Sequence, residues 1–222
     1  MEIPNDVAVM TLPNATLFPQ ALLPLYIFEP RYRRMLADAL QSHRLFAVAM
    51  QKSGRVRETP SNVAGLGLIR VCVDNPDGTS HLILQGLTRI ELADAVRTRP
   101  YRVHQIRTLQ ATPADNVTID ALLAKVRDLV NERVELGLPF ASQKSLGKKV
   151  KNTVLSAKEV IGYLDKINDA DQVADLVSCA LLHGAQERQT ILETVELEPR
   201  LRHLIHFLMA EIREHRKNKS DE

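Results

Sequence analysis

The sequence of 222 residues has few of the side chains on which bases or sugars stack, because aromatic residues make up 4% of it and tryptophan is absent. Two cysteines, Cys72 and Cys179, are too few for a disulfide framework or a cysteine-built zinc site, so we expect reduced thiols and a cytoplasmic location. The longest mostly apolar run, residues 21–28, is far shorter than a membrane span. The N-terminus also lacks the layout of a signal peptide. These shortages argue against a disulfide-stapled secreted domain and against a membrane protein.

The sequence also lacks a large excess of positive or negative charge. Lys and Arg total 29 against 27 Asp and Glu, so the net charge of +2 says little about partners. A site for nucleic acid would have to come from local clustering of basic residues. Hydrophobic residues make up 45% and charged residues 25% of the chain, which is typical of a folded, soluble protein.

Motifs that carry well-understood catalytic chemistry are missing. A phosphate-binding P-loop needs glycine, four residues, and then Gly-Lys-Ser or Gly-Lys-Thr. At the nearest approach, Gly147-Lys148, Ser142 stands at the first glycine position and Lys149 replaces the hydroxyl residue. The dinucleotide, α/β-hydrolase and zincin motifs are also absent. We therefore predict no cofactor and no catalytic residues.

Two clusters of polar residues could be mistaken for functional sites. His203 and His206 are close enough on a helix to share a metal ion, but both point roughly 150° away from the apolar stripe of that helix. We expect them to face solvent and predict no metal site. Glu193, Glu196 and Glu198 are interpreted as a solvated turn, because nothing in the sequence would desolvate them and separate their pKa values.

The first half of the chain has the pattern of strands with one helix. Short apolar runs bounded by turn residues predict strands at residues 7–12, 45–50, 66–73, 81–85, 89–92 and 101–106. Asn75 to Gly78 predicts a hairpin turn, and Gly86 is expected to end the strand before it. A helix should begin at Pro30, because Tyr32, Met35, Leu36, Ala39 and Leu40 then form one apolar stripe. About six short strands suggest a small, strongly curved sheet or barrel.

After Thr112-Pro113 the period of the apolar residues becomes helical. Four stripes predict helices over residues 119–134, 150–164, 173–181 and from Pro199 to Ile212. Asp169 or Asp171 should cap the third of these helices, and Gly184 should close it. The expected organisation is an α+β protein with a β-rich domain at residues 1–112 and a helical domain at residues 113–222.

Several motifs resemble a known family. In the first half they are Leu12-Pro-Asn, Leu17-Phe-Pro, Leu23-Pro-Leu, Ile27-Phe-Glu-Pro-Arg-Tyr-Arg, Gly65-Leu-Gly-Leu-Ile, Asp77-Gly78 and Gln85-Gly-Leu-Thr-Arg-Ile, and in the second half Ala174-Asp-Leu, Gln189 to Leu192 and Arg200-Leu201. With these motifs the chain resembles, over nearly its whole length, the N-terminal domain of the ATP-dependent Lon protease family. The resemblance implies a PUA-like β-barrel followed by a helical bundle. It also implies a role in recognising unfolded or tagged substrates and in assembling the oligomer.

The ATPase module and the Ser-Lys protease module of Lon would follow this domain, and the sequence ends at Glu222 before either of them. We therefore expect a non-catalytic, stand-alone binding module in bacterial protein quality control, acting as an adaptor or regulator of proteolysis. Its expected partners are unfolded or partner polypeptides, and the full-length Lon protease is a further candidate partner.

Candidate polypeptide-binding residues come from the proline-interrupted first block of motifs. They are Leu17, Phe18, Leu22, Phe28, Arg31 and Tyr32. A polypeptide site needs an exposed apolar patch or an open strand edge, and this block is a credible place for one. The same apolar residues would also suit the core of a small barrel, and Arg31 would suit a helix start, so both interpretations stay open.

An alternative function is binding of RNA or another polyanion. The resemblance contributes to it because PUA-like barrels include RNA-binding members. The candidate residues are Lys144, Lys148, Lys149 and Lys151, whose cluster would equally suit a solvated helix start. Polyanion binding through these residues would depend steeply on salt. A third hypothesis is a small-molecule hydrolase or binding protein with an unrecognised pocket.

Overall fold

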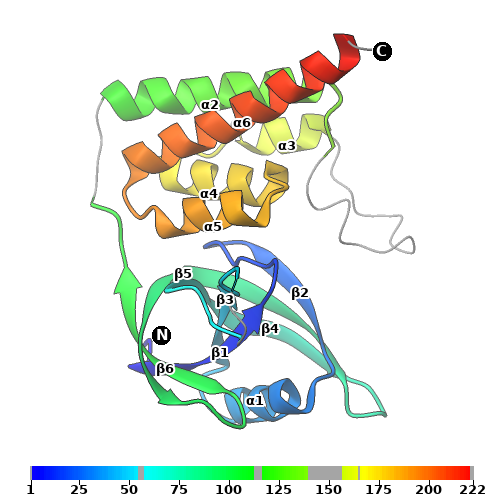
Figure 1. Ribbon diagram of the computed structural model, residues 1–222, viewed down its shortest axis with the longest axis vertical. Coiled ribbons are helices and arrows are strands. Elements are labelled where there is room, and N and C mark those ends of the chain that lie inside the picture. The colour runs from blue at the N-terminus through cyan, green and yellow to red at the C-terminus, as the bar shows by residue number, and fades with distance from the viewer. Residues whose placement is uncertain (1, 55–57, 113–116, 140–156, 165, 221–222) are drawn as a thin grey trace. The chain divides into compact units, whose positions relative to one another are not determined.

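The computed structural model describes residues 2–54, 58–112, 117–139, 157–164 and 166–220 (Figure 1). The chain divides into two compact units, Met1–Gln110 and Ala111–Glu222. The described strands and one helix lie in the first unit, and the second unit is helical, so the predicted α+β class is confirmed. No helix within the described ranges is both long and apolar enough to cross a membrane.

The first unit contains one curved sheet and one helix. Its strands are β1 (Asp6–Leu12), β2 (Leu22–Ile27), β3 (Leu45–Met50), β4 (Val63–Asp74), β5 (Ser80–Arg97) and β6 (Arg102–Leu109), and α1 (Pro30–Leu40) lies between β2 and β3. The order in the sheet is β2-β5-β4-β3-β1-β6, and β6 also pairs with β5. This last pairing closes five of the strands into a barrel (Figure 1), and β2 remains outside the closure as an edge strand on β5.

Helix α1 forms where the sequence predicts it. Pro30 stands at the start of the helix, where its missing N–H would have no partner, and Tyr32, Met35, Leu36 and Ala39 bury one face. The Tyr32 hydroxyl accepts a hydrogen bond from the backbone N–H of Thr11 and donates one to the carbonyl of Thr11, both at 3.1 Å. Tyr32 therefore fastens α1 to strand β1.

Strand β3 lies at the centre of the core. Phe46 and Val48 join a cluster that includes the buried residues of α1, and the alternate residues Ala47 and Ala49 join a second cluster. Because successive side chains of a strand point to opposite faces, a strand buried on both faces must be apolar throughout. The sequence Leu45–Met50 satisfies this requirement, and all six of its residues are buried.

The prediction that Gly86 ends a strand is wrong, because β5 runs without interruption from Ser80 to Arg97. A Cβ atom at Gly86 would lie 1.9 Å from the carbonyl oxygen of Phe18, and one at Gly65 would lie 1.9 Å from the carbonyl oxygen of Leu17. Glycine is therefore required where the Leu17-Phe18 backbone crosses close to the sheet, and it does not break the strand.

The second unit contains the helices α2 (Val117–Glu135), α3 (Ala157–Leu164), α4 (Ala170–Leu181), α5 (Ala185–Glu193) and α6 (Leu197–Ser220). Asp169 caps α4, because its Oδ1 accepts the backbone N–H groups of Asp171 at 2.9 Å and Gln172 at 3.3 Å. Gly184 lies three residues after the end of α4 and directly before α5, a helix that the apolar stripes did not predict. Helices α2, α4 and α6 contact one another, and Val126, Val177 and Leu204 are among the buried apolar residues that they contribute.

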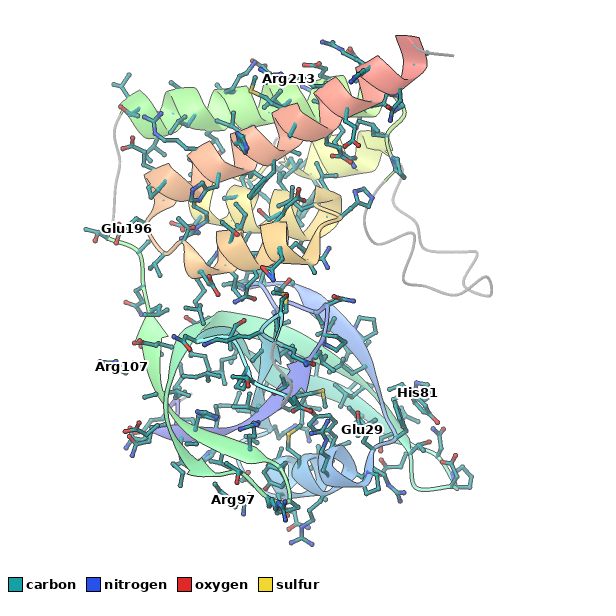
Figure 2. The ribbon with its side chains drawn as sticks, in the orientation of Figure 1. Glu29, His81, Arg97, Arg107, Glu196 and Arg213 are labelled. Atoms are coloured by element: carbon teal, nitrogen blue, oxygen red, sulfur yellow. The ribbon has the colours of Figure 1, made fainter. Side chains whose placement is uncertain are left out.

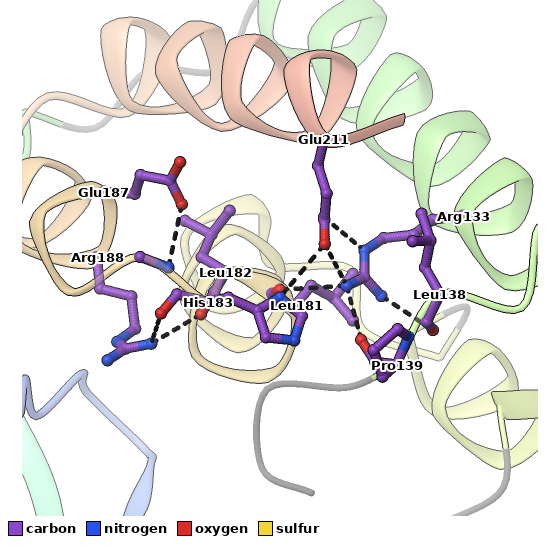
Figure 3. Close-up of polar contacts among 10 residues, drawn as sticks. Arg133, Leu138, Pro139, Leu181, Leu182, His183, Glu187, Arg188 and Glu211 are labelled. Carbon is purple, nitrogen blue, oxygen red and sulfur yellow. Dashed lines mark hydrogen bonds and ion pairs between the residues drawn. The ribbon is translucent and has the colours of Figure 1, made fainter. Parts of the chain in front are cut away.

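Two arginines are buried in the helical unit. Arg133 of α2 is 0% exposed, and its Nε and Nη2 donate to the two carboxylate oxygens of Glu211 of α6 at 2.8 and 2.9 Å (Figure 3). Its remaining donors reach the carbonyls of Leu138, Pro139 and Leu181. Arg200 of α6 is 1% exposed and bonds Asp171 at 2.7 Å. A buried guanidinium needs this number of partners, because burying a charge without them is costly.

Candidate functional site

Exposed apolar side chains gather on one part of the barrel. The large apolar residues that are exposed in the described part of the chain are Leu22, Tyr26, Phe28, Val71, Val73, Val96, Val117 and Tyr163. Five of these eight belong to β2, to β4 or to Phe28, which directly follows β2. We call this region the β2 patch, and it consists of Leu22, Pro24, Tyr26 and Phe28 with Val71, Val73, His81 and Ile83.

The strand register explains how the β2 patch is assembled. Tyr26 of β2 pairs with His81 of β5, which pairs with Val73 of β4. One step along the sheet, Pro24 pairs with Ile83, and Ile83 with Val71. Since alternate residues of a strand share one face, each of these rows presents three neighbouring side chains on the same side of the sheet.

Aromatic rings dominate one end of the β2 patch. The ring of Tyr26 stacks on the ring of Phe28 with centroids 5.8 Å apart, and on the imidazole of His81 with centroids 4.7 Å apart. Figure 2 shows His81 on the outside of the barrel. Stacked rings form a rigid apolar surface that loses little conformational entropy when a partner covers it.

The intervening residues of β2 face the interior. Leu23 and Leu25 pack against the core cluster as half-buried side chains, and Ile27 is fully buried within it. The alternation of exposed and buried side chains is typical of a strand with one face on a core and the other free. Pro24 is tolerated in this strand because β2 lies at the edge of the sheet.

Of the six residues predicted to bind polypeptides, the structure places Leu22 and Phe28 in the β2 patch, where they are 62% and 58% exposed. Leu17, Phe18 and Tyr32 are instead core residues, exposed by 4% or less, so their side chains are not available to a partner. Their side chains therefore belong to the core and not to a binding surface. The Leu17-Phe18 segment packs against the glycines of the sheet, and Tyr32 lies on the buried face of α1.

Arg31, the sixth predicted residue, is half-exposed next to the start of α1. Its guanidinium bonds Glu29 at 2.9 Å and Glu58 at 2.7 Å, and it lies 4.4 Å from the centroid of the Tyr32 ring. Burial and the nearby Glu58 carboxylate raise the pKa of Tyr32 above its ordinary value of 10.0. Two carboxylates therefore balance the charge of Arg31, and it does not project as an isolated cation.

Sequence reasoning missed Tyr26, Val71, Val73, His81 and Ile83. The segment Leu22–Ile27 is apolar at nearly every position, so its sequence shows no alternation that would assign an exposed face, and only the structure shows that exposure alternates along it. The two valines of β4 could be assigned to the same face only with the β4–β5 register, which contains two irregularities. The sequence does not reveal such shifts.

The other sequence candidates lie elsewhere. Lys144, Lys148, Lys149 and Lys151 lie outside the described residues. His203 and His206 are exposed on α6, as predicted from the position of the apolar stripe. Cys72 lies on the opposite side of β4 from Val71 and Val73, and desolvation together with the Asp74 carboxylate raises the pKa of its thiol. At neutral pH that thiol is protonated and is a poor nucleophile.

A polar pocket of about 250 Å³ lies elsewhere in the first unit. The Tyr101 hydroxyl donates to Asp38 Oδ2 at 2.7 Å, and the Arg97 guanidinium lies 4.5 Å from the centroid of the Tyr101 ring. The hydrogen bond from Tyr101 holds the pKa of Asp38 below its ordinary value of 3.8. The principal charged groups of this pocket therefore interact with one another.

The chain is similar to known proteins over most of its length. The model of the ATP-dependent protease La (LON) substrate-binding domain family matches residues 6–210. A Lon protease of Dictyoglomus thermophilum is 24% identical over 214 residues, which cover 95% of this chain and 25% of that protein. Lon protease 1 of Hydrogenovibrio crunogenus is 26% identical over 220 residues, covering 96% of this chain and 24% of that protein. The chain thus spans about a quarter of the length of the curated relatives that it matches.

Solved structures show the same fold. The N-terminal domain of a Mycobacterium avium complex Lon protease has a TM-score of 0.69 at 20% identity, covering 92% of this chain and 98% of that one. A Lon N-terminal domain protein from Xanthomonas campestris has a TM-score of 0.63 at 16% identity, covering 91% of this chain and 98% of that one. At these identities the similarity establishes the fold alone.

Proposed function

Because the chain belongs to the Lon substrate-binding domain family, we propose that it is a substrate-recognition module that binds unfolded polypeptides through the β2 patch. The matched family is a binding domain, and the proposed role requires no catalytic residue in this chain. Action as an adaptor or regulator of proteolysis, a partnership with a full-length Lon protease and a cytoplasmic location are parts of the same proposal.

The observation that carries the proposal is the exposure of the β2 patch. Leu22, Tyr26, Phe28, Val71 and Val73 are each about half exposed or more. They lie on β2, directly after it or on β4, and β5 pairs with both of these strands. Covering a Leu or Phe side chain with apolar groups of a partner stabilises a complex by about 1.5–3 kcal/mol. Part of this gain is lost in ordering the partner, so several such contacts are needed for micromolar affinity. The β2 patch offers enough of them.

The client implied by this chemistry is a chain whose apolar side chains are accessible. A folded protein keeps most of its large apolar residues inside, whereas an unfolded one presents them to solvent. The side chains of Leu22, Pro24, Tyr26, Phe28, Val71, Val73 and Ile83 carry no formal charge. Binding should therefore depend little on salt.

The test is fluorescence anisotropy with labelled, reduced and alkylated α-lactalbumin, which stays unfolded, titrated with the full chain at low and physiological salt. We expect saturable binding that changes less than threefold between the two salt concentrations. The variant Phe28→Ser should weaken binding by about tenfold, because a buried Phe contact contributes about 1.4 kcal/mol or more.

The matched control is Val96→Ser. Val96 lies on β5 in the same unit and is 58% exposed, as Phe28 is, but it lies outside the β2 patch. Its substitution should leave the affinity within twofold of the parent protein. Equal losses in the two variants, or no saturable binding by the parent chain, would contradict the proposal.

Binding of RNA is the alternative that the same titration decides, with a labelled single-stranded RNA in place of the polypeptide. In the described part of the barrel Arg31, Arg34 and Arg107 each form an ion pair with a carboxylate, which reduces their attraction for phosphate. RNA binding that falls steeply between the two salt concentrations, without polypeptide binding, would replace the proposed function by the alternative.

A further inference from the structure

The outer edge of β2 is unpaired. In the described part of the chain β2 pairs with β5 alone and stands at the end of the sheet order. An edge strand presents a row of backbone N–H and C=O groups that a further strand can use. Which residues present these groups follows from the hydrogen-bond alternation of an antiparallel pair.

One hydrogen bond and the register between β2 and β5 determine that alternation. The backbone N–H of Gly86 donates to the carbonyl of Ala21 at 2.8 Å, so Ala21 directs its carbonyl toward β5. Every second residue from Ala21, namely Leu23, Leu25 and Ile27, then bonds to β5, and the residues between them direct their backbone groups away from it. Pro24 falls in this second set, as it must, because it has no N–H to donate to β5.

Leu22, Pro24 and Tyr26 therefore direct their backbone groups toward the free edge, and their side chains belong to the β2 patch. The edge offers the carbonyls of all three residues and the N–H groups of Leu22 and Tyr26. Main-chain pairing and side-chain contact are thus available at the same three residues. A partner that uses both must be an extended polypeptide.

We propose that an uncharged, apolar segment of a client polypeptide adds to the free edge of β2 as a further antiparallel strand. This inference rests on the proposed function and specifies how the client is held. Its backbone pairs with Leu22 and Tyr26, and its alternate side chains extend the apolar rows of the β2 patch. Antiparallel pairing is chosen because it is the more stable arrangement per residue.

Pro24 distinguishes a client strand from a second copy of this chain. A client strand opposite β2 forgoes one hydrogen bond at Pro24, whereas pairing of two β2 edges would forgo one at each proline. Proline at an edge is a device by which proteins limit self-association through strand pairing. The composition of the surface points the same way, because the β2 patch contains no Lys, Arg, Asp or Glu and so complements an uncharged apolar segment.

The experiment uses the full chain and a labelled peptide that alternates valine and threonine, so that its valines define one face. Two further peptides carry N-methyl groups on the valines alone or on the threonines alone, which removes the amide donors along one edge of the strand. In an antiparallel strand with its valines on the β2 patch, the valine amides face β2. Methylation of the valines should weaken binding at least tenfold, and methylation of the threonines less than threefold.

The outcomes separate this inference from the proposed function. If the three peptides bind equally well, side-chain capture on the β2 patch stands and strand addition is overturned. If neither the unmethylated peptide nor unfolded α-lactalbumin binds, the proposed function itself is contradicted, and strand addition is contradicted with it. Self-association of the chain that increases with concentration and is suppressed by the peptide would identify a second copy as the occupant and overturn the proposal.

A pair of protein variants tests the same point from the other side. Leu22→Ala and Leu22→Pro both remove the exposed side chain, but only proline also removes the N–H that faces the free edge. Proline is tolerated at the first position of an edge strand, so the sheet should form, which circular dichroism can verify. We expect Leu22→Pro to bind the unmethylated peptide at least fivefold more weakly than Leu22→Ala. Equal affinities of the two variants would overturn strand addition.

Discussion

In the N-terminal unit Tyr26, Phe28 and Val73 are about half exposed, whereas in the helical unit Arg133 and Arg200 are almost completely buried. The barrel keeps a cluster of large apolar side chains in water, and the bundle keeps two arginines in its interior at 1% exposure or less. Both arrangements oppose the usual distribution, and they differ in how they are compensated. Each buried arginine is saturated by carboxylates and carbonyls of its own unit, while the apolar groups of the β2 patch have no such internal partner.

The comparison indicates different roles for the two units. Internally satisfied charges give a bundle that holds its own shape, because each buried arginine joins segments distant in sequence. Arg133 of α2 is 78 residues from Glu211, and Arg200 is 29 residues from Asp171. Exposed apolar side chains instead stabilise nothing until a partner covers them. The barrel is therefore the unit in which a binding role is expected, and the bundle is expected to tolerate few internal changes.

The largest expected effect concerns the tight packing of the barrel. Gly65→Ala would place a Cβ 1.9 Å from the carbonyl oxygen of Leu17, and this backbone atom cannot move aside without displacing the buried segment. We expect the free energy of unfolding to fall by about 3 kcal/mol or more. Urea unfolding followed by circular dichroism measures this change.

The matched control is the same substitution in the bundle. A Cβ at Gly162 of α3 would meet nothing within 4 Å. Alanine has the higher helix propensity, so Gly162→Ala should stabilise the protein by about 0.5–1 kcal/mol. If both substitutions lowered the free energy of unfolding equally, the difference in packing around Gly65 and Gly162 would be contradicted.

The second prediction removes a buried charge from the bundle. Arg133→Met removes the guanidinium from the carbonyls of Leu138 and Pro139 and from the Glu211 carboxylate, which keeps its contact with His183 Nδ1 at 3.3 Å. Breaking a fully buried ion pair costs about 3–5 kcal/mol, and because Glu211 is 28% exposed we expect a smaller loss, about 2–3 kcal/mol. Urea unfolding of the full chain provides the measurement.

Arg202→Met is the control for the buried arginine. Arg202 bonds Glu198 at 2.8 Å on the same helix, α6, that carries Glu211, but it is 58% exposed. An exposed pair of this kind contributes less than about 0.5 kcal/mol. If Arg133→Met were as mild as Arg202→Met, the bundle would not depend on its internal charges.

The smallest effect belongs to a half-exposed polar contact of the barrel. The Tyr101 hydroxyl holds the pKa of Asp38 below 3.8, so the folded state gains stability from this contact above that pH and loses it as the pH falls and Asp38 is protonated. Tyr101→Phe should therefore cost under about 1 kcal/mol at pH 7, since Asp38 is partly exposed. The difference from the parent protein should shrink as the pH falls below 3.8.

Urea unfolding at pH 7, 5 and 3 measures this dependence, and Tyr163→Phe serves as the control. Tyr163 is 58% exposed on α3, so loss of its hydroxyl should change nothing at any of these pH values. A penalty for Tyr101→Phe that grows as the pH falls would contradict the assigned direction of the Asp38 pKa.

Much of the secondary structure follows from local patterns. The apolar stripe of α1 and the Asn75–Gly78 turn of the β4–β5 hairpin depend on residues close in sequence, and both are present as predicted. Helix α5 and the central part of β5 were missed for opposite reasons. The stripe of α5 is short, and Gly86 has the usual signature of a strand end although it serves a close contact with a distant segment.

The candidate site could be predicted only in part. Phe18 and Phe28 have the same side chain and lie ten residues apart, yet one is 1% and the other 58% exposed. The difference arises from Gly65 and Gly86, which admit the Leu17-Phe18 segment to the interior. No local pattern near residue 18 contains that information. The valines of the β2 patch depend in the same way on the register between strands that are distant from β2 in sequence.

The closure of the barrel by β6 has a consequence for the time at which this protein folds. Strand β1 pairs with β6, where Asp6 lies opposite Gln105. The ribosome therefore synthesises β1 at the beginning of the first unit and its partner β6 near the end of that unit. Until residues 102–109 have left the ribosome, β1 has an open side next to Val7 and Val9, which the finished unit buries. A nascent chain that pauses before this point is itself an incompletely folded polypeptide with an exposed apolar strand. The barrel thus passes, while it is being made, through a state resembling the clients proposed for it.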